Sequence, residues 1–210
     1  SPRYQQGRFG RGRWQRFDMV VDEIDDLAPL ICMGDDAAKT INMMLDNGTD
    51  AFISNSEKVR YGIRMGGESP SKDVRVGGAN RVFTGIFRKD WDAKDFRNSN
   101  YYNADRFTVR FRTEAMLDTD NIYYARDSFG EVSLMQTSHK GNTVSAMRRS
   151  ASGGGNEMLF KQTLPLSELD FVPVADAATK KALIKRLREA GIKPASGKRW
   201  ESIVQVVERR

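Results

Sequence analysis

The chain has 210 residues, of which 39% are hydrophobic, and carries a formal net charge of +6. It is long enough to bury a sizeable core, while a mean hydropathy of −0.58 and the absence of any apolar run of roughly 18 residues exclude a membrane-spanning protein. Its single cysteine, Cys32, and single histidine, His139, exclude an intramolecular disulfide, a cysteine-built zinc site and a histidine-rich metal site. We therefore expect neither a metal nor a cofactor.

Charge alternates along the chain in blocks. Residues 1–18 carry +4, 19–57 carry −8, 58–112 carry +7, 113–175 carry −3 and 176–210 carry +6. Three basic blocks separated by acidic ones are typical of a protein with basic surfaces that bind a polyanion.

The first block, residues 1–18, contains five arginines, four aromatic rings and three glycines, without a helical or strand period. This composition predicts a disordered basic arm. Guanidinium groups pair with phosphate and stack on bases, as aromatic rings do, so the arm favours single-stranded nucleic acid. The alternative is an arm that packs on the acidic block 19–57 or on a neighbouring subunit. The candidate binding residues are Arg3, Arg8, Arg11, Arg13, Trp14 and Arg16.

Residues 19–33 are ambiguous between a strand and a short helix that stops before Pro29. The next segment, "GDDAAKTINMMLDNG" (34–48), predicts a helix. Asp35 or Asp36 can cap its start, an apolar stripe follows its helical period, and Gly48 stands where a helix ends.

From residue 52 onward the apolar period changes to two, which predicts strands. The segment "RVFTGIFR" (81–88) is apolar on both faces and is typical of a central strand. The segment "RFTVRFR" (106–112) turns its apolar residues inward and its arginines outward. Arginines two apart on a strand match the spacing of phosphates along a single strand, so they form a candidate phosphate rail. The alternative is an ordinary solvent face paired with cross-strand acids. The rail comprises Arg60, Arg64, Arg106, Arg110 and Arg112.

The last block, 176–210, predicts two helices. Asp176 is a candidate cap of the first helix and Gly191 its stop. The second helix follows from an i, i+3, i+4, i+7 stripe, and its apolar positions are Trp200, Ile203, Val204 and Val207.

Over about 30 residues this block resembles the helical DNA-binding module of large serine recombinases. The matching positions are Leu187, Gly191, Ile192, Gly197 and Trp200. The resemblance implies a DNA-binding module in which Lys198 and Arg199 open the second helix. It does not imply strand exchange, because nothing upstream resembles the nucleophilic serine domain of that family. The alternative is purely structural, with Gly191 ending a helix and Trp200 filling a small core.

Support for catalysis is weak. The glycine-rich segments "VGGAN" and "SGGGN" lack the Lys-Ser/Thr pair of a phosphate loop, and Ser138-His139 has no persuasive third partner. The sequence therefore predicts a protein that is not an enzyme.

Together these features predict an α+β protein. It has a disordered arm (1–18), a mainly antiparallel sheet domain with a flanking helix (19–175) and a basic two-helix module (176–210). The expected function is non-enzymatic binding of nucleic acid, with single-stranded DNA or RNA favoured over duplex. The rival is a structural assembly protein, such as a viral coat component with an internal arginine arm, and a homo-oligomer is compatible with both. The polar, arginine-rich start lacks the apolar stretch of a signal peptide, so we expect an intracellular protein, cytoplasmic or nucleoid-associated, or a virion component.

Overall fold

The structure is a computed structural model. It describes residues 3–9, 12–18, 24–33, 35–52, 81–89, 106–117, 122–124, 147–148, 151, 156–161 and 163–207. For β1, β2, β7 and a few single residues it describes only the backbone.

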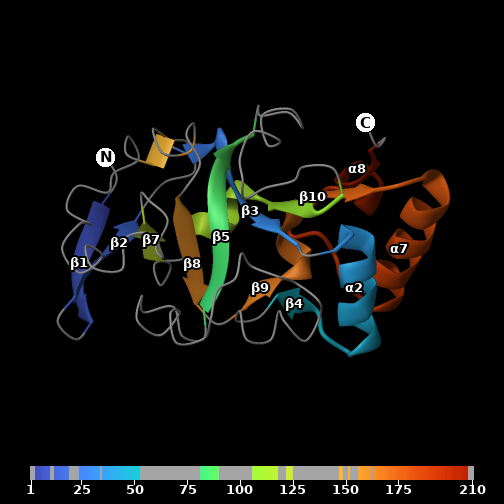
Figure 1. Ribbon diagram of the computed structural model, residues 1–210, viewed down its shortest axis with the longest axis horizontal. Helices are drawn as coiled ribbons and strands as arrows, with labels where there is room; N and C mark the ends of the chain where they lie inside the picture. The colour runs from blue at the N-terminus through green and yellow to red at the C-terminus, as the bar shows by residue number, and fades with distance from the viewer. Residues whose placement is uncertain are drawn as a thin grey trace.

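The described residues form one nine-stranded sheet, in the order β1-β2-β7-β8-β5-β3-β6-β10-β11 (Figure 1). Every described pair is antiparallel except β10 with β11, which is parallel. The strands are β1 (Arg3–Phe9), β2 (Gly12–Asp18), β3 (Leu27–Cys32), β5 (Arg81–Arg88), β6 (Thr108–Phe111), β7 (Ile122–Tyr124), β8 (Glu157–Lys161), β10 (Leu169–Val174) and β11 (Val204–Val206). A separate two-stranded sheet pairs β4 (Ala51–Phe52) with β9 (Leu164–Pro165).

The helices are α2 (Ala37–Asp46), α7 (Ala177–Glu189) and the short α8 (Trp200–Ile203), with 3-10 turns η1 (Thr113–Leu117) and η2 (Leu166–Glu168). Helices α2 and α7 pack against each other and against β10 at one end of the sheet (Figure 1). The predicted α+β class is confirmed.

The main core lies between these helices and one face of the sheet. Ile41 and Met44 of α2 and Leu187 of α7 meet Val109 and Phe111 of β6 there, and all five are fully buried. Val109 and Phe111 of "RFTVRFR" are therefore turned into the core as predicted, whereas Phe107 is only partly buried and Thr108, expected on the outer face, is 4% exposed.

Strand β5 is buried on both faces, as expected for a central strand. Val82 and Ile86 join the main core, whereas Phe83 and Phe87 point to the other face and are equally buried. The strand lies between β8 and β3. A strand with two apolar faces reads in sequence as a continuous hydrophobic run.

A buried asparagine connects β5 to the start of β8. Asn156 is 1% exposed, its Nδ2 donates to the Ile86 carbonyl at 2.9 Å, and its Oδ1 accepts from the Ile86 amide at 2.8 Å. Both polar ends of the side chain are thus satisfied in an otherwise apolar region, as burial of an amide requires.

Helix α2 has the ends that its sequence predicts. The Asp36 carboxylate accepts a hydrogen bond from the Ala38 amide at 3.1 Å, and Gly48 beyond the helix adopts a positive φ of 69°. Arg106 lies 3.5 Å from the same carboxylate. The capping oxygen thus satisfies a backbone donor that has no partner within the helix.

Replacing Asp36 with alanine should destabilise the protein by about 1 kcal/mol, because the Ala38 amide loses its acceptor. Asp36→Asn should recover most of that loss, since asparagine caps helices as well as aspartate does. Urea denaturation of both variants measures the difference. Equal destabilisation by the two substitutions would show that the ion pair with Arg106, not the cap, dominates.

Two predicted elements differ in the structure. Residues 1–18 were predicted to be a disordered arm, but β1 and β2 form an antiparallel hairpin, and Arg16 of β2 pairs with Ile122 of β7. Strand pairing is made by backbone groups, so a segment without alternating side chains still pairs where a strand edge is open to it.

The second difference is at the C-terminal end. The stripe from Trp200 was predicted as one helix, but α8 ends at Ile203 and Val204–Val206 forms β11, parallel to β10. The valines at 204, 206 and 207 are β-branched and favour an extended backbone. The C-terminal residues thereby extend the sheet.

Candidate nucleic-acid interface

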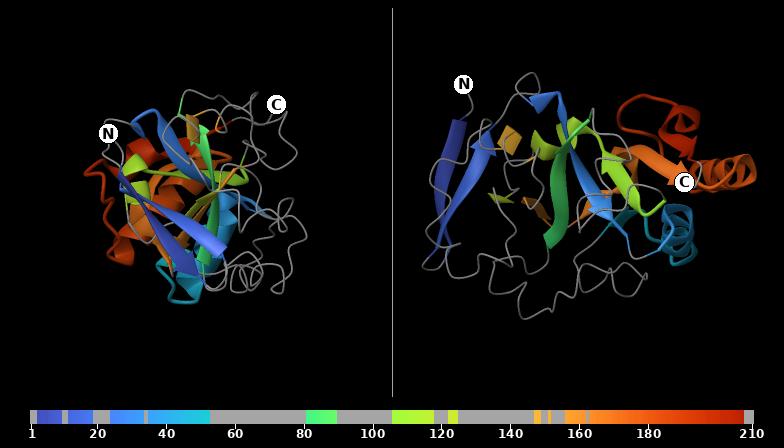
Figure 2. Two further views of the ribbon diagram at one scale, coloured as in Figure 1. Left: turned by 90° about the vertical axis from the view of Figure 1, so that its left-hand side faces the viewer. Right: turned by 45° about the horizontal axis from the view of Figure 1, so that its top comes forward.

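The predicted arm residues that the structure describes lie on the hairpin. Arg3 and Arg8 belong to β1, and Arg13, Trp14 and Arg16 belong to β2. The hairpin and α7 lie at opposite ends of the long axis of the molecule (Figures 1 and 2). The hairpin therefore does not share a local surface with the C-terminal helices. The remaining candidates Arg11, Arg60 and Arg64 lie outside the described residues.

The three strand-face arginines that the structure describes are each paired with an acid. Arg106 pairs with Asp36, and the Arg110 guanidinium lies 3.2 Å from Asp170. Arg112 holds Glu168 with both Nε and one terminal nitrogen. The pair of Arg110 with Asp170 of β10 is the cross-strand contact that the sequence left open as the alternative to a phosphate rail, whereas Asp36 caps α2 and Glu168 lies in η2. Replacing the three arginines would remove these ion pairs and leave Asp170 paired with Lys198. A phosphate-binding role of this face stays a prediction.

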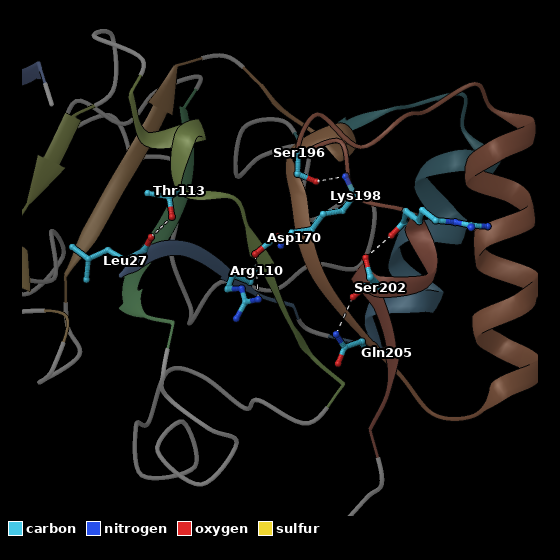
Figure 3. Close-up of polar contacts among 9 residues, drawn as sticks. Leu27, Arg110, Thr113, Asp170, Ser196, Lys198, Ser202 and Gln205 are labelled. Carbon is cyan, nitrogen blue, oxygen red and sulfur yellow. Dashed lines mark hydrogen bonds and ion pairs between the residues drawn. The ribbon is translucent and has the colours of Figure 1, made fainter. Parts of the chain in front are cut away.

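Asp170 is the centre of the largest of these ion clusters. Its side chain is 6% exposed and lies between Arg110 of β6 and Lys198 of the loop before α8, at 3.2 and 2.8 Å (Figure 3). Burial alone raises the pKa of the Asp170 carboxyl, but the hydrogen bond from Lys198 and the charge of Arg110 outweigh it and hold that pKa below its usual value. Lys198, predicted from sequence as a nucleic-acid contact, thus has a structural partner.

The outer face of α7 carries a stripe of cations. Lys181, Lys185 and Arg188 follow each other at i, i+4 and i+7, and all three are exposed. The opposite face buries Leu183 and Leu187 in the core. Residues three and four apart share a face of a helix, so these three charges form one row.

Helix α7 is fixed at both ends. Asp176 caps its start by accepting a hydrogen bond from the Thr179 amide at 2.7 Å, and this bond lowers the pKa of the Asp176 carboxyl. Near its end, Arg186 donates to Asp46 and to Asn42 of α2. The row of cations is therefore held on a rigid element.

Beyond α7 the chain turns at Gly191, which has a φ of 73°. The Ile192 amide then donates back to the Leu187 carbonyl at 3.0 Å. Trp200, 2% exposed, donates from Nε1 to the Ile192 carbonyl at 2.9 Å and ties the turn to α8. The structural interpretation of Gly191 and Trp200 therefore accounts for both residues, and a DNA-binding role of the module stays a prediction.

This turn lines a half-open pocket of about 230 Å³. Its walls combine apolar groups with three cations and are made by Arg188, Gly191, Ile192, Lys193, Pro194, Arg199 and Trp200. Glu201 is paired with Arg188 at 2.7 Å and with Arg199 at 3.6 Å. In the described part of the chain no acid forms an ion pair with Lys193.

Of the residues predicted in this region, Arg199 lines the pocket and its side chain is 81% exposed. Sequence reasoning missed Lys181, Lys185, Arg188 and Lys193. Their signal was present in "KKALIKRLREAGIK", where basic residues recur at helical spacing opposite the buried leucines.

Within the described ranges, no three His, Cys, Asp or Glu side chains gather as metal ligands would. In the same ranges, no helix combines the length and the apolar character needed to cross a membrane.

No protein-family model matches the chain, and no curated protein matches its sequence. One similar solved structure is that of Thermus sp. 2.9 DarT in complex with ADP-ribosylated single-stranded DNA. It has 8% sequence identity and a TM-score of 0.38, and the match covers 88% of this chain and 94% of the DarT chain.

This neighbour contradicts the prediction that the chain is not an enzyme, because DarT is an ADP-ribosyltransferase. That prediction is withdrawn. At this TM-score the likeness assigns neither a reaction nor a substrate to the chain.

Proposed function

We propose that the protein binds nucleic acid through a C-terminal basic surface, and that it favours single strands. This surface consists of Lys181, Lys185, Arg188, Lys193 and Arg199. The observation that carries the proposal is that the row of cations on α7 runs through Arg188 into the rim of the pocket. Residues 177–207 contain eight basic residues against two acidic ones, so the surface is strongly positive.

The spacing of the row suits a polyphosphate. At 1.5 Å of rise per residue, Lys181 and Arg188 are separated by about 10 Å along the helix, with Lys185 between them. Evenly repeated, exposed cations attract successive backbone phosphates without reading sequence. The partner is therefore expected to bind with a strong dependence on salt.

The hairpin remains part of the proposal as a second basic area. Arg3, Arg8, Arg13 and Arg16 lie on its two strands, together with Trp14. The strand-face arginines contribute less, because their paired side chains are only 19–28% exposed, whereas those of Arg188 and Arg199 are 50% and 81% exposed.

Neutralising three lysines of the surface tests the proposal. In Lys181→Gln, Lys185→Gln, Lys193→Gln, binding to a single-stranded oligonucleotide should weaken. The slope of log K against log salt should flatten by about 2, at about 0.7 per lost phosphate contact. Fluorescence anisotropy over a salt series measures both quantities, with single- and double-stranded DNA and RNA as ligands.

The matched control neutralises three other exposed cations, Lys39, Arg88 and Arg148. It changes the net charge by the same amount and leaves the C-terminal basic surface intact. An equal effect of both triple variants would show that only net charge matters, and the proposed surface would then be wrong.

A further inference from the structure

The pocket beside α7 differs in chemistry from the row of cations that leads to it. Ile192, Pro194 and Trp200 give it apolar walls, and Arg188, Lys193 and Arg199 give it positive ones. Apolar walls suit a ligand group other than phosphate.

We propose that this pocket takes one unpaired base of the strand held by the C-terminal basic surface, with the flanking phosphates on Lys193 and Arg199. The inference rests on the proposed function and gives a physical reason for the preference for single strands.

The size of the pocket fits a single base. Its volume of about 230 Å³ is below the roughly 300–1,000 Å³ of sites for drug-sized ligands. A flat heterocycle with apolar faces matches the walls made by Ile192 and Pro194. The Arg199 guanidinium is planar and mostly exposed, so it can stack on a base that enters beside it.

The charges at the rim favour a base that is attached to phosphates. Glu201 directly follows the pocket residue Trp200, and it is already engaged by Arg188 and Arg199. The hydrogen bond from its own backbone amide and the contact with Arg188 hold the pKa of Glu201 below its usual value, so it stays charged and paired at neutral pH. Lys193 has no such partner among the described acids and is available to a phosphate.

The preference for single strands follows from stacking. In a duplex each base is paired and stacked, and moving it into a pocket costs several kcal/mol. An unpaired base makes this move at little cost, and single-strand binding proteins gain affinity from each base that stacks on an aromatic or arginine side chain.

The test compares two ligands with the same phosphates. One is a thymidine pentanucleotide, and the other is a pentanucleotide of abasic sites, which has the same charge and no bases. If a base enters the pocket, the unmodified protein should bind the thymidine strand roughly 5- to 150-fold more tightly, with the same salt slope for both.

Two glycine substitutions then locate the effect. Gly191 and Gly197 both have positive φ, at 73° and 76°, and an added Cβ meets nothing within 4 Å at either position. Asparagine tolerates this backbone region, so both variants should fold. Gly191 lines the pocket and Gly197 does not. Gly191→Asn should therefore bring the ratio of affinities for the thymidine and abasic strands close to one. Gly197→Asn should leave this ratio unchanged.

The outcomes separate this inference from the proposed function. Salt-dependent binding with equal affinity for both strands would overturn the base pocket and leave nucleic-acid binding in place. Failure to bind any oligonucleotide at low salt would overturn both. Displacement of the strands by a glutamate-rich peptide of equal charge, at equal or lower concentration, would show that the site recognises acidic protein instead.

Discussion

Replacing Trp200 with alanine is expected to destabilise the protein by about 3–5 kcal/mol, the usual cost of removing a large aromatic side chain from a core. Trp200 is 2% exposed and belongs to the main core together with Leu187 and Ile203. Its indole also donates to the Ile192 carbonyl, which would be left without that partner. Guanidinium denaturation, followed by the change in midpoint at constant m-value, measures the loss.

Trp200→Phe separates the two contributions. Phenylalanine keeps most of the buried apolar surface and removes the indole donor, so a smaller loss of about 1–2 kcal/mol is expected. If the free energy of unfolding of Trp200→Ala lies within about 0.5 kcal/mol of that of the unmodified protein, the C-terminal helices do not unfold cooperatively with the rest of the protein.

The second large effect is expected at Asp170. Asp170→Asn should destabilise the protein by about 2–3 kcal/mol at neutral pH. The reason is that the half-buried Arg110 and the loop residue Lys198 both lose the carboxylate with which they are paired. The Nε atom of Arg110 is buried without an acceptor, and Asp170 is the acid with which this guanidinium pairs among the described residues. Asp46→Asn is the control, since it breaks the more exposed pair with Arg186 and should cost about 0.5 kcal/mol or less.

The same substitution should change the response to acid. Burial alone would raise the pKa of the Asp170 carboxyl. Lys198 and Arg110 lower this pKa by more than burial raises it, so the folded-state pKa lies below the ordinary value of 3.8. The stabilisation is therefore complete above pH 3.8 and is lost as the pH falls through the lower folded-state pKa. The gap in stability between the unmodified protein and Asp170→Asn should narrow in that range. A gap that stays constant down to pH 2 would show that Asp170 is not stabilised as the charged form.

Local signals predicted the parts of the fold that depend on local structure. Helix α2 was expected because its cap, apolar stripe and terminal glycine all lie within residues 34–48. Strand β5 was expected to be central because apolar residues occupy both of its faces. Each of these patterns can be read without knowing what the element packs against.

The parts that were missed depend on distant partners. Arg112 and Glu168 are 56 residues apart in sequence, so no local pattern showed that the arginine is neutralised. The hairpin forms next to β7, a strand more than 100 residues away. The sequence supplied an outward row of arginines and a glycine-rich arm. The partners of these two segments are set by the order of strands in the sheet.

Strand β11 was missed for a different reason. Val204 satisfies a helical stripe with Trp200 and also suits a strand, and the parallel contact with β10 decides in favour of the strand. By contrast, the exposed cations on α7 needed no tertiary information, because their helical spacing is visible in the sequence.

The contacts of Asn156 have a consequence for strand register. A strand with one apolar face is held in register by that face, since a slip of one residue would turn its core side chains outward. The hydrophobic pattern of strand β5 does not fix its register in this way, because both of its faces are apolar. In an antiparallel strand the two backbone polar groups of one residue point to one neighbour, and those of the next residue point to the other. A one-residue slip would set the Asn156 amide opposite Gly85 or Phe87, whose backbone groups point to β3, and would leave the buried amide unsatisfied. One polar side chain at the start of β8 thus selects a single alignment that the hydrophobic pattern of β5 leaves open.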